Sequence, residues 1–295
     1  MPESPTLSQF FDAWELFRVP TLAGTVAGAV LGFLGVYIVL RRMVFLTAAL
    51  SQCAGLGVVI AFYLRTKAPY LANVITPTAG ALLSTVAAAL IPMFDPTPIG
   101  NRRDALLGAL FLVGAAGTLA LGTRIVEEIH DVESLLFGSA VVVLEKDLTA
   151  LVFTGSLVFL IHLIFLRGFS QTSFDATDAR VRGLPVKFIQ LALLLTLALS
   201  ISITTRILGA LPVFAFSVMP AVAALRTASN IRRAMLLASV IGGASGFCGY
   251  VAAFLYNLPV GASQVLSTMA FLALTIGVEW VGPIVTGYLQ PKRPI

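Results

Sequence analysis

The chain has 295 residues, of which 58% are hydrophobic and 11% are charged, and its mean hydropathy is +0.96. Soluble domains carry about 25% charged residues, so this composition excludes a water-soluble globular protein and indicates an integral membrane protein. The formal net charge is +5, and the positions of the basic residues explain it through membrane topology, without a nucleic-acid partner.

The first 18 residues carry Glu3, Asp12 and Glu15 against a single Arg18. A cleavable signal peptide begins with a positively charged region, so this segment does not read as one. We expect residues 9–18 to lie at the membrane interface and treat 1–18 as an N-terminal interfacial segment.

Stretches without Asp, Glu, Lys or Arg then follow one another along the chain. They cover 19–40, 43–64, 68–94, 105–123, 148–166, 188–205, 207–225 and 234–278. A helix needs about 20 apolar residues to cross the hydrocarbon core, and none of the stretches shows the alternating pattern of a barrel strand. The last one is too long for one span. Pro259 and Gly261 favour a turn inside it, so it predicts two helices, about 234–256 and 263–287.

The sequence therefore predicts an all-α, polytopic transmembrane helix bundle of about nine membrane segments. Lys and Arg are enriched in cytoplasmic loops, and an N-terminus outside with a cytoplasmic C-terminus places 13 of the 19 on that side. These are Arg41, Arg42, Arg102, Arg103, Arg167, Arg180, Arg182, Lys187, Arg226, Arg232, Arg233, Lys292 and Arg293. Residues 290–295 form a cytoplasmic tail in this topology.

The loop between the fourth and fifth spans is acidic and lies outside in this topology. It contains Glu127, Glu128, His130 and Asp131, followed by Glu145 and Asp147 at its end. This loop could attract cations as an outer entrance, or it could be a solvated loop. The two cysteines, Cys53 and Cys248, lie in predicted spans without CxxC spacing and are expected to be buried thiols.

No motif in the chain supplies its own energy source or catalytic centre. A phosphate-binding GxxxxGK[ST] run, HExxH and GxSxG are all absent, so the chain is not expected to be an enzyme and any ATP hydrolysis must take place on a partner. A secondary carrier needs ionisable groups at membrane depth. Only Glu279 and His162 qualify, and an interfacial anchor and a packing residue are the preferred interpretations of them.

The cytoplasmic loop 167–187 predicts a short helix at about 173–183. Ser173 or Asp175 can cap its N-terminus, acidic residues come early and basic residues late, and Gly183 can end it. The helix is either a connector or a segment that a soluble motor domain could grip.

Within this loop, Phe174, Asp175, Ala179, Gly183 and Val186 resemble the coupling segment of the zinc- and manganese-uptake ABC permease family. Further similarities follow in family order. They are Arg41-Arg42-Met43 with Phe45-Leu46 and Ala49-Leu50-Ser51, Leu135-Leu136-Phe137-Gly138-Ser139 with Asp147-Leu148, Leu208-Gly209-Ala210-Leu211 with Met219-Pro220-Ala221, and Leu258-Pro259-Val260-Gly261-Ala262. The resemblance spans about residues 20–285.

The resemblance implies a transmembrane permease domain over 19–289, in the cytoplasmic (inner) membrane. It implies an ABC importer in which this chain pairs with a second permease copy, as a homodimer or a heterodimer. Two cytoplasmic ATPase subunits would bind ATP and Mg, an extracytoplasmic metal-binding protein would deliver the cargo, and this chain would hold no cofactor. Phe174, Asp175, Ala179 and Gly183 would couple to the ATPase. The implied cargo is a divalent metal ion, zinc first and manganese or iron next.

One departure from the family bears on the cargo. Many members read Asp-Ala-Leu-Ser-His in the second helix, where residues four apart share a face and can converge on one ion, whereas this chain has Ala48 and Gln52 at those positions. The candidate translocation path therefore rests on neutral donors: Ser51, Gln52, Cys53 and Asn257. The metal ligands stay unassigned.

Three explanations for this departure are open. The metal binds elsewhere, the cargo is a metal chelate or another solute, or the chain pairs with a sister subunit that carries the ligands. A function of another class, an ion-coupled carrier or channel using Glu279 and His162, is the remaining alternative, and a non-transporting membrane scaffold ranks below it.

Overall fold

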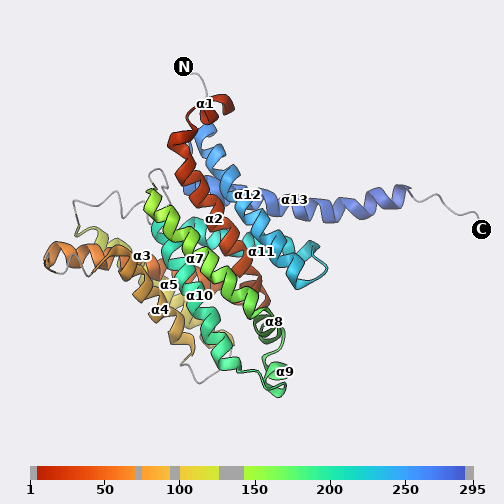
Figure 1. Ribbon diagram of the computed structural model, residues 1–295, viewed down its shortest axis with the longest axis horizontal. Coiled ribbons are helices and arrows are strands. Elements are labelled where there is room, and N and C mark those ends of the chain that lie inside the picture. Colours follow the sequence, from red (N-terminus) through yellow and green to blue (C-terminus); the bar gives the residue numbers. More distant parts are fainter. Residues whose placement is uncertain (1–4, 69, 71–74, 94–99, 126–142, 290–295) are drawn as a thin grey trace, which may run out of the picture.

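The computed structural model describes residues 5–68, 70, 75–93, 100–125 and 143–289, and these form helices without strands (Figure 1). The helices are α1 (Leu7–Asp12), α2 (Trp14–Leu40), α3 (Val44–Lys67), α4 (Pro77–Leu90), α5 (Gly100–Gly122), α7 (Glu145–Ile164), α8 (Leu166–Phe174), α9 (Ala176–Val181), α10 (Val186–Leu208), α11 (Ala210–Thr227), α12 (Ile231–Tyr256) and α13 (Val260–Leu289), with a 3-10 turn η2 (Ile91–Met93) after α4.

The predicted bundle of about nine membrane segments is confirmed. Within the described residues, eight helices are long and apolar enough to span a membrane, and α4 is a shorter apolar helix. The run 68–94 predicted a full span there, but α4 has only 14 residues, about 21 Å at 1.5 Å per residue. It starts late because Thr76 caps it and Pro77 occupies its first turn.

The helices form two groups that α10 and α11 join. In one group α2 packs against α11 and α12, and these two pack against α13; in the other, α3 packs against α4 and α5. Helix α10 contacts α3, α4, α7 and α11, and α11 also contacts α3. Figure 1 shows α3 to α5 on the left, α2, α11 and α12 in the centre, and α13 extending away to the right.

Glycine allows the closest helix contacts. A Cβ on Gly28 of α2 would overlap the carbonyl oxygen of Gly242 of α12, and the reciprocal clash holds for Gly242. The same geometry recurs between Gly57 of α3 and Gly80 of α4. Small residues of this kind let helix backbones approach each other in membranes, so these positions set the spacing of both groups.

The two cysteines differ from each other. Cys53 is buried, as predicted, but the prediction that Cys248 is a buried thiol is wrong, since its side chain is exposed. The buried face of α12 follows Gly242, Gly246 and Gly249, and Cys248 lies beside that face rather than on it.

The N-terminal segment packs against α12. Thr6 caps α1, and α2 begins at Trp14, earlier than the uncharged run, with Glu15 in its first turn where the helix dipole favours an acid. Phe10 is fully buried and its ring contacts Phe254 at a centroid distance of 5.4 Å. An interfacial position for 1–18 stays a prediction.

Two ion pairs hold the start of α7. Arg206 of α10 pairs with Asp147 in a half-buried position, and Arg18 of α2 donates to Glu145 at 3.0 Å near the surface. Both acids were expected in the acidic outer loop, and the structure instead joins them to neighbouring helices.

The close approach of α2 and α12 predicts a sharp difference between two glycine substitutions. Gly28→Ala should lower the thermal unfolding temperature in detergent, because overpacking costs about 1–3 kcal/mol. Gly277→Ala is the matched control on α13, where a Cβ meets nothing within 4 Å, and it should leave the unfolding temperature unchanged. Equal unfolding temperatures for the two variants would contradict the packing argument.

Candidate functional site

The segment between α7 and α10 consists of two short helices rather than one. Helix α7 ends at Ile164, α8 continues to Phe174, and α9 follows as a separate helix. Asp175 separates the two helices because its backbone is extended (φ −147°, ψ 105°). Its carboxylate accepts hydrogen bonds from the backbone N–H groups of Thr177 at 2.7 Å and Asp178 at 3.0 Å. Asp175 is therefore the N-cap, and the expected helix 173–183 narrows to Ala176–Val181.

Ser173 has a different role from the capping one considered for it. It lies in α8, where its hydroxyl donates to the carbonyl oxygen of Phe169 at 2.6 Å and accepts from Arg41 Nε at 2.9 Å. Arg41 also donates to Thr172 Oγ1 at 2.8 Å. This arginine lies in the turn between α2 and α3, so it ties that turn to the end of α8.

The C-terminus of α9 closes in a Schellman motif. Gly183 has φ +79°, its N–H donates to the carbonyl of Arg180, and the N–H of Leu184 donates to that of Ala179, both at 3.0 Å. This motif bonds the two residues after the cap back to the third- and second-last helical residues. Ala179 and Gly183 are therefore four residues apart for a geometric reason.

The four residues expected to couple to a motor lie together around α9. Phe174 is 68% exposed and Asp175 is also exposed, whereas Ala179 is fully buried and packs the helix against the rest of the chain. Gly183 is exposed at the opposite end. Figure 1 shows α8 and α9 projecting at the lower end of the bundle, away from the N-terminus.

The candidate path residues on α3 face its helical neighbours. Ser51 is buried and its hydroxyl donates to the carbonyl of Ala48 at 3.0 Å, and Cys53 Sγ contacts the carbonyl of Leu110 in α5 at 3.6 Å. The Oε1 atom of Gln52 is buried and has no hydrogen-bond partner in the described part of the chain. Gln52 is thus the polar group on this helix with unused bonding capacity.

Asn257 lies apart from these α3 residues. It caps α12 in the left-handed conformation (φ 51°) and is exposed. The end of α12 lies beside the start of α2, since Phe254 contacts Phe17. The outer-entrance candidates Glu127, Glu128, His130 and Asp131 lie outside the described residues. Among the residues with described positions, no group of three His, Cys, Asp or Glu could hold a metal ion.

His162 and Glu279 do not share a site. His162 of α7 is fully buried, its Nε2 lies 3.0 Å from Thr196 Oγ1, and its ring stacks on Phe169 with centroids 4.2 Å apart. Glu279 of α13 accepts from Arg226 Nε at 2.7 Å and is 45% exposed. The structure places the histidine in an aromatic cluster and the glutamate in a partly exposed ion pair between α11 and α13.

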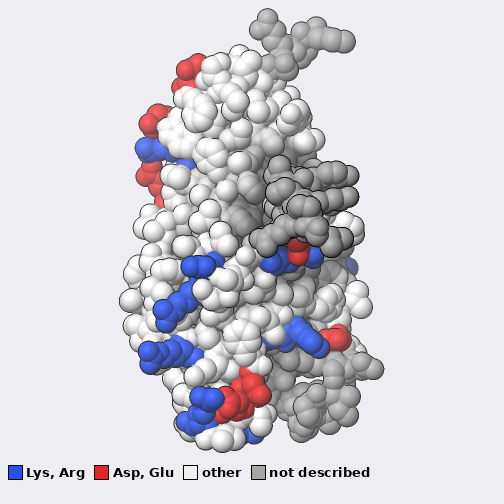
Figure 2. Space-filling model, turned by 90° about the vertical axis from the view of Figure 1, so that its right-hand side faces the viewer, with Lys and Arg blue, Asp and Glu red and all other residues white. Residues whose placement is uncertain are grey.

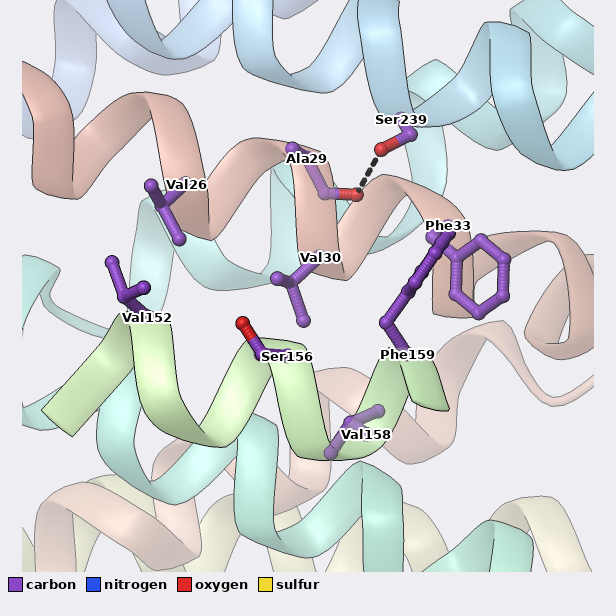
Figure 3. Close-up of a pocket in the computed structure, with 10 residues that line it drawn as sticks. Val26, Ala29, Val30, Phe33, Val152, Ser156, Val158, Phe159 and Ser239 are labelled. Atoms are coloured by element: carbon purple, nitrogen blue, oxygen red, sulfur yellow. Dashed lines mark hydrogen bonds between the residues drawn. The ribbon is translucent and has the colours of Figure 1, made fainter. Parts of the chain in front are cut away.

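A cavity of about 290 Å³ lies between α2 and α7. Figure 3 shows valine and phenylalanine side chains of both helices facing it, with Ser156 on one wall and Ser239 donating to the carbonyl of Ala29 at 3.0 Å. Its lining contains no carboxylate, imidazole or thiol, so it offers apolar surface rather than ion ligands.

The sequence did not reveal the tether formed by Arg41. The Arg41-Arg42 pair indicated topology and, with Met43, a family resemblance, and nothing in its spacing joins it to hydroxyl groups about 130 residues later. In α8, Phe169 and Ser173 are four residues apart and both are buried, which puts them on one face of the helix.

Comparisons with known proteins agree with this fold. The model of a family described as "ABC 3 transport family" matches residues 13–278. The manganese transport system membrane protein MntC of Halalkalibacterium halodurans is 27% identical over 290 residues, covering 97% of this chain and 96% of the relative. The chelated iron transport system membrane protein YfeD of Yersinia pestis is 24% identical, covering 95% and 91%.

The fold also matches a solved structure. The structure of PsaBC from Streptococcus pneumoniae in complex with Fab superposes with a TM-score of 0.80 at 24% identity, covering 92% of this chain and 95% of the other.

The tether from Arg41 predicts a local change in dynamics. Arg41→Gln should speed hydrogen–deuterium exchange of the α8 backbone amides, because both hydrogen bonds that hold the end of α8 are lost. Arg42→Gln removes the same charge from the same turn and should leave exchange in α8 unchanged. Identical exchange in the two variants would refute the tether.

Proposed function

The chain belongs to the ABC 3 transport family, and we propose that it is the membrane-spanning subunit of an ATP-driven importer of a divalent metal ion. In this proposal two permease copies, identical or related, enclose the translocation path. Two separate cytoplasmic ATPase subunits bind ATP and Mg, and an extracytoplasmic binding protein delivers the metal. The chain itself breaks no bonds and holds no cofactor.

The observation that carries the proposal is the α8–α9 segment. Helix α9 is capped at both ends, by Asp175 and by the Schellman motif at Gly183, so a helix of only six residues keeps its shape. The exposed Phe174 and Asp175 would present a surface to a motor subunit. We propose that this segment is the coupling helix.

Arg41 would transmit a movement of α9, caused by the ATPase subunit, to α3. A movement of α9 carries α8 with it, and α8 is bonded to the turn between α2 and α3 through Thr172 and Ser173. Helix α3 begins at that turn and carries Ser51 and Gln52. The coupling segment and the candidate path are therefore joined by a short chain of contacts.

For the cargo we propose manganese ahead of zinc. The sequence analysis had placed zinc first. Relatives reported above are named for manganese and for chelated iron, and the α3 donors are mainly oxygens: the amide of Gln52 and the hydroxyl of Ser51. Manganese favours oxygen donors, whereas zinc sites in proteins use mainly thiolate and imidazole. In this proposal Glu127, Glu128, His130 and Asp131 form the outer entrance.

A metal chelate is the second candidate cargo. A chelator satisfies the ion's coordination, so neutral groups such as the unpaired Gln52 Oε1 would suffice to line its path. The carrier alternative gains no support, because His162 and Glu279 lie on different helices and each already has a partner.

We also propose an inner-membrane location with the N-terminus outside and the C-terminus in the cytoplasm. The proposal is supported by α8 and α9 lying at the end of the bundle opposite the N-terminus. Figure 2 shows Lys and Arg side chains gathered over the lower half of one face, the half nearer that end, as expected for a cytoplasmic side.

The coupling helix can be tested at Gly183 in proteoliposomes that contain the ATPase subunits. Gly183→Val should lower ATP-driven manganese uptake at least about tenfold, because a β-branched residue strains at φ +79°. Gly183→Asn should keep most uptake, since asparagine tolerates this conformation. Gly277→Val on α13 is the control, and full uptake by Gly183→Val would refute the coupling role.

The cargo can be tested by ATP turnover of the assembled complex with its binding protein. Manganese should stimulate turnover more than zinc or iron at equal free-ion concentration. Stronger stimulation by zinc would reverse the order proposed here. If the complex assembles with the ATPase but its turnover responds to none of the three ions, the cargo is a chelate rather than a free ion.

A further inference from the structure

A second cavity lies where α7 turns into α8 and faces α10. It has a volume of about 680 Å³, within the range of about 300–1,000 Å³ typical of small-molecule sites. Its walls are mainly apolar, and several wall residues are open to the outside: Ile164 is 66% exposed and Phe188 is 62% exposed. Buried Phe169 and Ile189 form deeper parts of the wall.

Two arginines from different helices complete the lining. Arg167 comes from the first turn of α8 and Arg232 from the first turn of α12. Neither has an ion pair or hydrogen bond from its side chain to another part of the chain that the structure describes. Three described acids at this end are engaged elsewhere: Asp178 pairs with Arg182, Glu279 pairs with Arg226, and Asp175 caps α9.

Arg232 lies at the N-terminus of α12, where a bound anion would be favourable. The N-terminus of a helix carries a partial positive charge, so basic residues there are unfavourable. Helix α12 nevertheless starts with Arg232 and Arg233, and only the amide of Asn230 caps it. An anion between Arg232 and Arg167 would offset the helix dipole and both side-chain charges.

The position of the cavity relative to the membrane layers indicates which anion fits. Helix α7 is a membrane span and α8 follows it at the end that carries the basic residues, so the apolar walls adjoin the hydrocarbon and the arginines adjoin the headgroup layer. A soluble anion would leave the walls unfilled. Anionic lipids are attracted to basic residues on the cytoplasmic side, and basic pockets between membrane helices bind their headgroups.

Resting on the orientation proposed above, we propose that this cavity binds an anionic phospholipid of the cytoplasmic leaflet. Its phosphate lies between Arg167 and Arg232, and its acyl chains cover the walls formed by Ile164, Phe165 and Phe188. The lipid then rests against α8, directly before α9. The site does not depend on which cargo the protein carries or on how a motor engages it.

Lipid binding can be measured by native mass spectrometry of the purified protein with 1-palmitoyl-2-oleoyl phosphatidylglycerol, and with the phosphatidylcholine of the same chains. The wild type should retain phosphatidylglycerol in preference to phosphatidylcholine. The double variant Arg167→Gln, Arg232→Gln should lower the retained phosphatidylglycerol at least about tenfold, since each basic residue contributes to the attraction.

The control variant is Arg180→Gln, Arg233→Gln, which removes two arginines from the same end that do not line the cavity. It should retain the lipid as the wild type does, and an equal loss in both double variants would overturn the proposal in favour of diffuse charge. Ala192→Phe fills the cavity without changing charge and should also lower retention; unchanged retention would overturn the proposed site.

A protein occupant gives a different result. The variant Phe188→Cys, in a background where Cys53 and Cys248 are replaced by Ala, carries one cysteine in the cavity wall. In nanodiscs, phosphatidylglycerol should slow the reaction of this cysteine with a thiol reagent. Addition of the ATPase subunit should leave the reaction rate unchanged. Shielding by the ATPase alone would make the cavity a protein docking surface and overturn the lipid site.

Discussion

Close backbone contact at small residues holds this bundle together, because a bilayer gives apolar side chains little reason to prefer one another over lipid tails. Gly28 on Gly242 and Gly57 on Gly80 bring pairs of helices to a separation that no larger residue allows. At that separation dispersion and weak Cα–H···O contacts accumulate along the crossing. Ser239 adds a hydrogen bond to the backbone of Ala29 beside one of these crossings.

Helix α9 obeys a different constraint, since it follows α8 outside the spans and contacts mainly α8 and α10. Its shape depends on local backbone bonds, which explains the residue types at its ends. The N-cap position needs a side chain that accepts hydrogen bonds, as Asp175 does. The position after the C-cap needs a residue that adopts a positive φ, as Gly183 does. Ala179 is small and lies on the buried face of α9. The sequence motif of this segment is largely a description of two helix caps.

Features that depend on composition and local geometry were predictable from the sequence. Uncharged runs predicted the spans because a charge at membrane depth is costly. Asp175, one of two N-cap candidates, and Gly183 lie at the ends of α9. Features that depend on tertiary contacts were not predictable: the tether of Arg41 to Ser173, the ion pair of Arg206 with Asp147, and the exposed side of α12 on which Cys248 lies. Asn257 shows the same limit, since its distance in space from Gln52 follows from helix packing alone.

The two ion pairs at the start of α7 give that helix an unusual mechanical character. Arg18 and Arg206 hold Glu145 and Asp147 from two different helices, whereas the far end of α7 leads into α8 and α9. Near that far end, His162 lies 3.0 Å from Thr196 of α10, so α7 is joined to α10 near both of its ends. With 20 residues the helix is about 30 Å long, so a tilt of about 6° around the end at Asp147 displaces the other end by about 3 Å. A small rotation would therefore be enough to reposition side chains along α7 by amounts that grow steadily with distance from Asp147.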